Sequence, residues 1–112
     1  MDRDEAISRI RKALKARSGK SWSVTGGRGT AWGWIKISAP PARRTASFDG
    51  AETVSEFGCM TLADRAELAT LLGLERTHPQ GESIPASTAY RTEYVDRAEG
   101  RPPSTIGTPY WD

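Results

Sequence analysis

The chain opens with apolar residues at helical spacing. Ile7, Ile10 and Leu14 recur at intervals of three and four residues, which places them on one face of a helix. Acidic residues precede this face and basic residues follow it, in the order that a helix dipole favours. A glycine at position 19 then supplies a stop signal. The pattern predicts a helix over residues 2–17.

Two later segments show the same helical spacing. A helix is predicted over 61–72, where Thr61 can act as a cap and leucines repeat until a glycine ends the run. A further helix is predicted over 87–100, where Glu93 and Arg97 are spaced to pair across one helical turn. Together with the N-terminal segment, these patterns predict three helices.

Between the first two predicted helices, apolar and polar residues alternate with a period of two, as in a strand. Two β-rich runs, SWSVT and AWGWIKIS, flank the glycine-rich segment GGRGT, which predicts an antiparallel hairpin over residues 20–37. Because side chains alternate along a strand, one face of the second run is aliphatic and the other carries Trp32, Trp34 and Lys36. The aliphatic face is the expected core face, made by Ala31, Gly33, Ile35 and Ile37.

The remaining segments complete an α+β fold class. Residues 45–49 and 52–57 are expected as short strands, 75–85 as a loop, and 101–112 as an extended C-terminal tail. We expect a single α+β domain over residues 1–100, in which a small antiparallel sheet packs against the N-terminal helix. The two C-terminal helices would close it.

Composition narrows the class of protein. A chain of 112 residues has room for one domain. It has no apolar run of roughly 20 residues, and its charged N-terminus is unlike a signal peptide, so we expect a cytoplasmic protein without a membrane partner. Cys59 is the only cysteine and His78 the only histidine, which excludes an internal disulfide and a Cys/His metal site. We expect no cofactor.

Charge is divided unevenly along the sequence. Residues 1–48 hold eleven Lys/Arg against three acidic residues, a net charge of +8, whereas residues 49–112 hold five Arg against eleven acidic residues, a net charge of −6. The basic part would attract an anionic polymer. An acidic protein partner, or a second copy of the chain in a homo-oligomer, would be attracted by the same charge division.

The hairpin contains the strongest candidate chemistry. Tryptophans beside cations can stack on bases and hold phosphates, which is the arrangement found in single-stranded nucleic-acid sites. The alternative is that the tryptophans are core residues, as large aromatics usually are, and the sequence leaves both interpretations open. The predicted nucleic-acid-binding residues are Arg11, Lys12, Lys15, Lys20, Arg28, Trp32, Trp34, Lys36, Arg43 and Arg44.

Weaker signals have equally ordinary explanations. The TGGRG segment could surround a phosphate with backbone N–H groups, or its glycines could only supply the turn of the hairpin. Basic residues on the first helix could be a solvated face. A small-ligand loop with His78, Gln80 and Ser83 is a third hypothesis, but no GxSxG pattern accompanies it. We expect no catalytic residues and no enzyme.

The segment IRKALKARSGKSWSVTGGRGTAWGWIKI resembles small accessory domains of large polyvalent proteins from phages and conjugative elements, in which a KALK-type helix precedes a K-[FW]-S-V strand. The continuation through LATLLGL and SIPAS also resembles short bacterial hypothetical proteins. The first resemblance covers residues 9–37 and implies an α+β domain from a bacterium or mobile element, with no established activity or site residues. This chain departs from the pattern at Ser18-Gly19, where Pro-Gly is usual.

These observations predict a non-enzymatic nucleic-acid-binding accessory protein of low sequence specificity, with single strands favoured. The alternative prediction is a protein–protein interaction adapter or a self-associating module, in which tryptophans anchor a protein interface.

Overall fold

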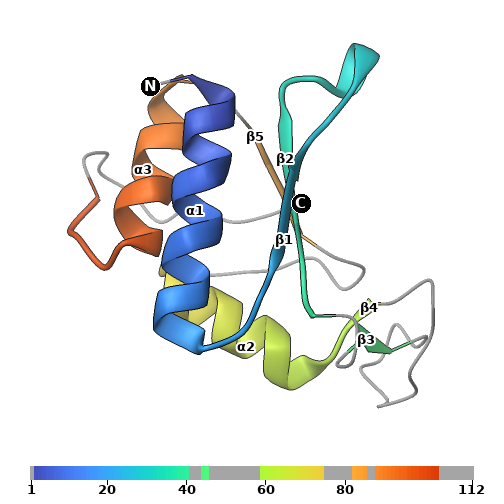
Figure 1. Cartoon of the computed structure of the whole chain (residues 1–112), viewed down its shortest axis with the longest axis vertical. Coiled ribbons are helices and arrows are strands. Elements are labelled where there is room, and N and C mark those ends of the chain that lie inside the picture. The colour runs from blue at the N-terminus through green and yellow to red at the C-terminus, as the bar shows by residue number, and fades with distance from the viewer. Residues whose placement is uncertain (1, 41–43, 46–58, 75–81, 86–87, 104–112) are drawn as a thin grey trace.

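The computed structural model describes residues 2–40, 44–45, 59–74, 82–85 and 88–103. Figure 1 shows their arrangement, with α1 and α3 on one side of a sheet and α2 across the end of the two helices. The elements are α1 (Arg3–Ser18), β1 (Ser23–Gly26), the short 3₁₀ helix η1 (Gly29–Ala31), β2 (Trp34–Ser38), β3 (Arg44–Thr45), β4 (Cys59–Met60), α2 (Leu62–Leu72), β5 (Glu82–Pro85) and α3 (Thr88–Ala98). The α+β class and the three predicted helices are confirmed.

Helix boundaries follow the capping residues of the sequence. Asp2 caps α1 by accepting a hydrogen bond from the backbone N–H of Glu5, and Thr61 caps α2 in the same way. Gly19 and Gly73 end these helices with φ of 74° and 63°, in the left-handed region that glycine adopts without strain. The predicted boundaries of both helices therefore agree with the structure to within one residue.

The main sheet has three antiparallel strands in the order β1-β2-β5. Residues 82–85 were expected to lie in a loop, and that prediction is wrong because they pair with β2 along its length, with Ile84 opposite Ile35. Among the described strands β5 lies at the edge of the sheet, and Pro85 is its last residue, a place where proline is tolerated in sheets.

One face of this sheet is the core face. Val24, Ile35, Ile37 and Ile84 come from all three strands, and each is fully buried. They share the core with Ile10 and Leu14 of α1. Burial of Ile35 and Ile37 confirms the aliphatic face of the hairpin as the core face.

The predicted strand alternation fails before residue 34. Ala31 and Gly33 were expected on the core face, but both are exposed. Residues 29–31 form η1, and β2 begins only at Trp34, so alternation cannot extend back to Ala31. The paired part of the hairpin is therefore shorter than predicted, and the loop at its tip is longer and contains η1.

Two arginines connect the C-terminal ends of the helices. Nη1 of Arg17 donates to the backbone carbonyls of Leu71 in α2 and of Arg97 and Ala98 at the end of α3. Arg97 donates in turn to the Gly73 carbonyl and pairs with buried Glu93 at 2.9 Å, which confirms the predicted pair within α3. These guanidiniums satisfy carbonyls that helix ends leave unpaired.

The second sheet consists of β3 and β4, which pair as Arg44 with Met60 and Thr45 with Cys59. Most of the short strands predicted over 45–49 and 52–57, and most of the tail over 101–112, lie outside the described residues. Within the described ranges no helix has the length and apolar character that crossing a membrane requires.

Candidate nucleic-acid interface

The tryptophans of the hairpin segment occupy different environments. Trp22, which precedes β1, is 2% exposed and belongs to the core. Its indole Nε1 donates to the Ser18 hydroxyl at 2.9 Å, so the polar atom of the buried ring is satisfied. Among the described residues, Trp32 and Trp34 are the exposed large hydrophobic ones, at 54% and 38%. Trp22 therefore supports the fold, and the other two are accessible to a ligand.

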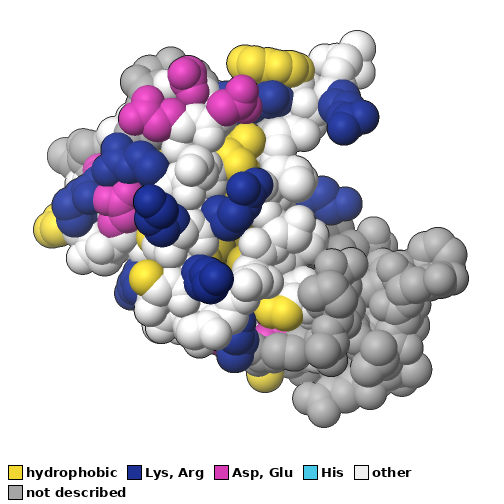
Figure 2. All heavy atoms as spheres, viewed as in Figure 1, with side chains coloured by type: hydrophobic (Ala, Val, Ile, Leu, Met, Phe, Trp, Pro, Cys, Tyr) yellow, Lys and Arg dark blue, Asp and Glu magenta, His cyan; other side chains and the backbone are white. Residues whose placement is uncertain are grey.

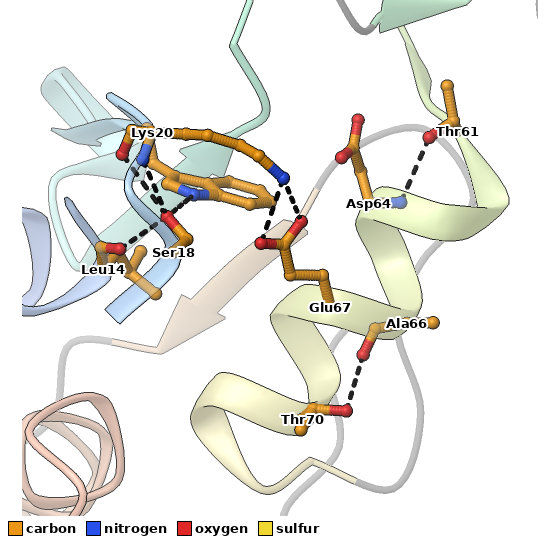
Figure 3. Close-up of polar contacts among 9 residues, drawn as sticks. Leu14, Ser18, Lys20, Thr61, Asp64, Ala66, Glu67 and Thr70 are labelled. Atoms are coloured by element: carbon orange, nitrogen blue, oxygen red, sulfur yellow. Dashed lines mark hydrogen bonds and ion pairs between the residues drawn. The ribbon is translucent and has the colours of Figure 1, made fainter. Parts of the chain in front are cut away.

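Lys20 also belongs to the base of the hairpin. Figure 3 shows its side chain reaching the carboxylate of Glu67 in α2, with Nζ 2.9 Å from Oε2. The Lys20 backbone N–H is held as well, because it donates to the hydroxyl of Ser18. Glu67 neutralises the charge of Lys20, so this ion pair disfavours the predicted contact between Lys20 and a phosphate.

The outer face of the sheet carries Trp34 and Lys36 on β2 and Thr25 on β1, all exposed. Thr25 is directly opposite Lys36 in the ladder, so the two side chains share this face. Among the described residues, α1 and α3 lie on the other side of the sheet (Figure 1). An indole and an ammonium thus lie two residues apart on one accessible strand surface.

At the tip of the hairpin, Trp32 is packed against Arg3 of α1. The guanidinium carbon of Arg3 lies 4.1 Å from the centroid of the indole, a cation–π contact. Nη1 of Arg3 also donates to the carbonyls of Gly27 and Trp32, at 2.9 and 2.7 Å. Arg3, only 13% exposed in its side chain, therefore joins both sides of the loop to the start of α1.

The glycines of the loop are required by its conformation. Gly29 has φ of 57°, and a Cβ on Gly27 would lie 1.7 Å from the Ala31 carbonyl oxygen. The backbone N–H groups of Gly27, Ala31 and Trp32 all donate to carbonyls of the hairpin. Because these three amides are engaged within the loop, they are not donors for the phosphate nest that the glycine-rich sequence suggested.

A groove of about 450 Å³ lies between α1 and the hairpin. Arg3, Arg11 and Arg28 line it together with the single acidic residue Asp4, whose carboxylate pairs with Arg3. Arg11 is fixed to the wall of the groove because its Nη2 donates to the Val24 carbonyl at 2.6 Å. The groove is thus electropositive and suited to an anion.

The other cations of α1 divide into two sets. Lys12 and Lys15 are exposed, and Figure 2 shows basic side chains distributed over this helix. Arg9, by contrast, forms a two-point contact with Glu99, which also pairs with Arg101. The hydrogen bond from Arg9 lowers the pKa of the Glu99 carboxyl from its ordinary value of 4.5. Arg9 therefore belongs to a structural ion network.

Some predicted site residues cannot be placed. Arg43, His78 and Gln80 lie outside the described residues. Arg44 is part of β3 and Ser83 of β5, where only their backbone positions are described. The structure therefore brings Arg11 and Arg28 to one groove, which Arg3 connects to Trp32, and places Trp34 with Lys36 on the sheet.

Arg3 is the residue of this surface that sequence reasoning missed. It lies at the first position of α1, far from the hairpin in sequence, and no local pattern predicts its contact with Trp32. One indirect signal exists in the sequence. An exposed tryptophan in a glycine-rich loop needs a partner to hold its ring, and a guanidinium is a preferred one.

Within the described part of the chain, no group of three or more His, Cys, Asp or Glu residues is arranged to hold a metal ion. Comparison with protein-family models, with curated protein sequences and with solved structures finds no match to this chain. The resemblance of residues 9–37 to accessory domains of polyvalent proteins therefore stays a prediction.

Proposed function

We propose that the protein binds single-stranded nucleic acid with little sequence preference, as a non-enzymatic accessory protein of a bacterium or mobile element. The observation that carries this proposal is the outer face of the sheet, where the exposed indole of Trp34 lies beside the exposed ammonium of Lys36. An indole offers a stacking surface to any base, and a cation beside it attracts the phosphate that accompanies the base.

Two further features support the proposal. The core does not need Trp34, because Ile35 and Ile37 fill the opposite face of the same strand. The indole of Trp34 is therefore available for stacking on a ligand without loss of core packing. The hairpin loop that precedes this strand also carries the exposed cation Arg28.

Single strands fit the surface better than a duplex does. A stacking platform needs bases whose faces are accessible, and those of a duplex are covered by their neighbours. No catalytic chemistry is part of the proposal, because binding needs only the contacts to bases and phosphates described above.

The test is quenching of tryptophan fluorescence on titration with single-stranded DNA, single-stranded RNA and duplex DNA at two salt concentrations. We expect quenching by single strands, reduced in Trp34→Phe, with an affinity that falls as salt rises. Trp22→Phe is the matched control. Because the Trp22 ring is buried, we expect this variant to show nearly the same quenching on binding as the unchanged protein. Equal affinity at low and moderate salt would contradict phosphate contacts.

The interaction adapter remains the second candidate function, because two exposed indoles also suit a protein interface. Sedimentation of the protein alone over a range of concentrations distinguishes it. Self-association that is abolished by Trp34→Ala, together with no quenching by any nucleic acid, would replace the first proposal with this one.

A further inference from the structure

We propose that the hairpin tip and the groove beside it form a subsite for one nucleotide unit. The base stacks on the indole of Trp32, and its phosphate lies in the groove between Arg11 and Arg28. This inference rests on the proposed function and deepens it, because it identifies a second, distinct contact point at the edge of the sheet platform.

The stacking half of the subsite is Trp32. Arg3 covers one face of the indole at 4.1 Å, and more than half of the residue is exposed, which leaves the opposite face open to solvent. A base that stacks there would form a three-layer arrangement of guanidinium, indole and base. The positive charge behind the ring strengthens the electrostatic attraction to the nucleotide.

The phosphate half is the groove. The side chain of Arg11 makes one hydrogen bond among the described residues, from Nη2, so Nε and Nη1 can donate to a ligand. The side chain of Arg28 is exposed and makes no hydrogen bond or ion pair with any described residue. Two guanidiniums that retain donors at one groove are well suited to phosphate oxygens, which accept the paired N–H groups of arginine.

Arg3 connects the two halves. It lines the groove, stacks on Trp32 and donates to the Trp32 carbonyl. A Cβ on Gly26 would lie 2.6 Å from its guanidinium, so this glycine gives Arg3 the space to lie along the strand. Arg3 is accordingly a positioning residue, because each of its three guanidinium nitrogens already donates to a loop carbonyl or to Asp4.

Asp4 does not prevent an anion from binding in this groove. Its carboxylate is 82% exposed and already pairs with Arg3, so its charge is largely compensated and screened by solvent. Arg11 and Arg28 remain as the cations without a carboxylate partner among the described residues.

The experiment is a heteronuclear NMR titration of the full chain with millimolar adenosine 5′-monophosphate, with adenosine and with inorganic phosphate as separate arms. We expect the monophosphate to shift both the indole N–H of Trp32 and the amides of residues 26–29. Adenosine should shift mainly the indole, and phosphate mainly the amides. Shifts confined to the sheet face around Lys36 would overturn the subsite.

The variants are Trp32→Ala and Arg28→Ala, with Lys15→Ala as the matched control for an exposed cation outside the subsite. Trp32→Ala should abolish the response to adenosine, and Arg28→Ala the response to phosphate. We expect each to weaken binding of a short oligothymidylate about tenfold, as expected for loss of one stacked base or one charged hydrogen-bonding group. If Lys15→Ala lowered the affinity for oligothymidylate as much as Arg28→Ala does, the result would contradict a defined phosphate position.

The design separates this inference from the proposed function. Oligothymidylate that quenches Trp34 while adenosine monophosphate leaves the tip unchanged would overturn the subsite and leave the proposed function standing. Adenosine monophosphate that shifts the tip of a protein with no affinity for oligonucleotides would support the subsite as a site for free nucleotides and overturn the proposed function.

Discussion

At the base of the hairpin, Lys20 and Trp22 contact other parts of the fold, whereas at its tip Arg28 and Trp32 face solvent. Both ends combine a cation with a tryptophan. At the base the cation is paired with Glu67 and the indole is buried and hydrogen-bonded. At the tip Trp32 is 54% exposed. Residue type alone therefore does not identify a binding surface, and burial and pairing decide which tryptophan is available.

The largest expected effect is at the base. Trp22→Ala should lower the free energy of unfolding by about 3–5 kcal/mol, because it removes a buried aromatic ring and leaves a cavity. Urea denaturation measures this loss, and Trp22→Phe, which keeps part of the ring volume, should cost less. A loss below about 1 kcal/mol would mean that Trp22 is no more structural than the tryptophans at the tip.

On the outer face the same substitution should act on binding. Trp34→Ala should weaken single-strand binding by about 1–3 kcal/mol, the contribution of one stacked base, while stability changes by less than about 1 kcal/mol. Direct titration and urea denaturation of the same sample measure the two quantities. A large loss of stability without a change in affinity would assign Trp34 to the fold and remove the contrast.

Arg3 tests whether the tip is itself organised. Arg3→Ala removes two hydrogen bonds to loop carbonyls and the contact with Trp32, and should cost about 1–2 kcal/mol of stability. We also expect the indole N–H signal of Trp32 to broaden or move in NMR spectra, since the ring loses its support. Arg3→Lys is the control that keeps the charge. An unchanged indole signal in Arg3→Ala would show that the loop holds Trp32 without this residue.

The smallest effect is expected at Lys20. An ion pair at the surface contributes about 0–1 kcal/mol, so Lys20→Ala should have little effect on unfolding. Because Glu67 already neutralises this cation, the salt dependence of nucleic-acid binding should also stay the same. In contrast, Lys36→Ala should lower the slope of log affinity against log salt by about 0.7, the value for one contact to a single strand. Equal slopes for both variants would remove the distinction between the two lysines.

Local patterns were sufficient for the helices. Asp2, Thr61, Gly19 and Gly73 act through hydrogen bonds and backbone angles within a few residues, so the sequence around each of them predicts its role. The aliphatic face of β2 was equally predictable, because the alternation of side chains between the two faces can be read from the sequence of the strand itself.

Contacts between distant segments could not be predicted in this way. β5 looked like a loop because its pairing partner is β2, far earlier in the chain. Lys20 looked like a phosphate ligand until α2 brought Glu67 to it. Arg3 was overlooked for the same reason, since its loop partners are more than twenty residues away. Which tryptophan faces solvent depends on such contacts.

The bonds from Arg17 to the ends of α2 and α3 have a consequence for the order of unfolding. Because one guanidinium holds carbonyls of Leu71, Arg97 and Ala98, opening any one helix end exposes polar groups at the others. The three helices should therefore open as one cooperative unit, and their amide protons should exchange with solvent at similar rates. The hairpin tip is tied to the opposite end of α1 through Arg3, so it contacts this unit at the first turn of that helix.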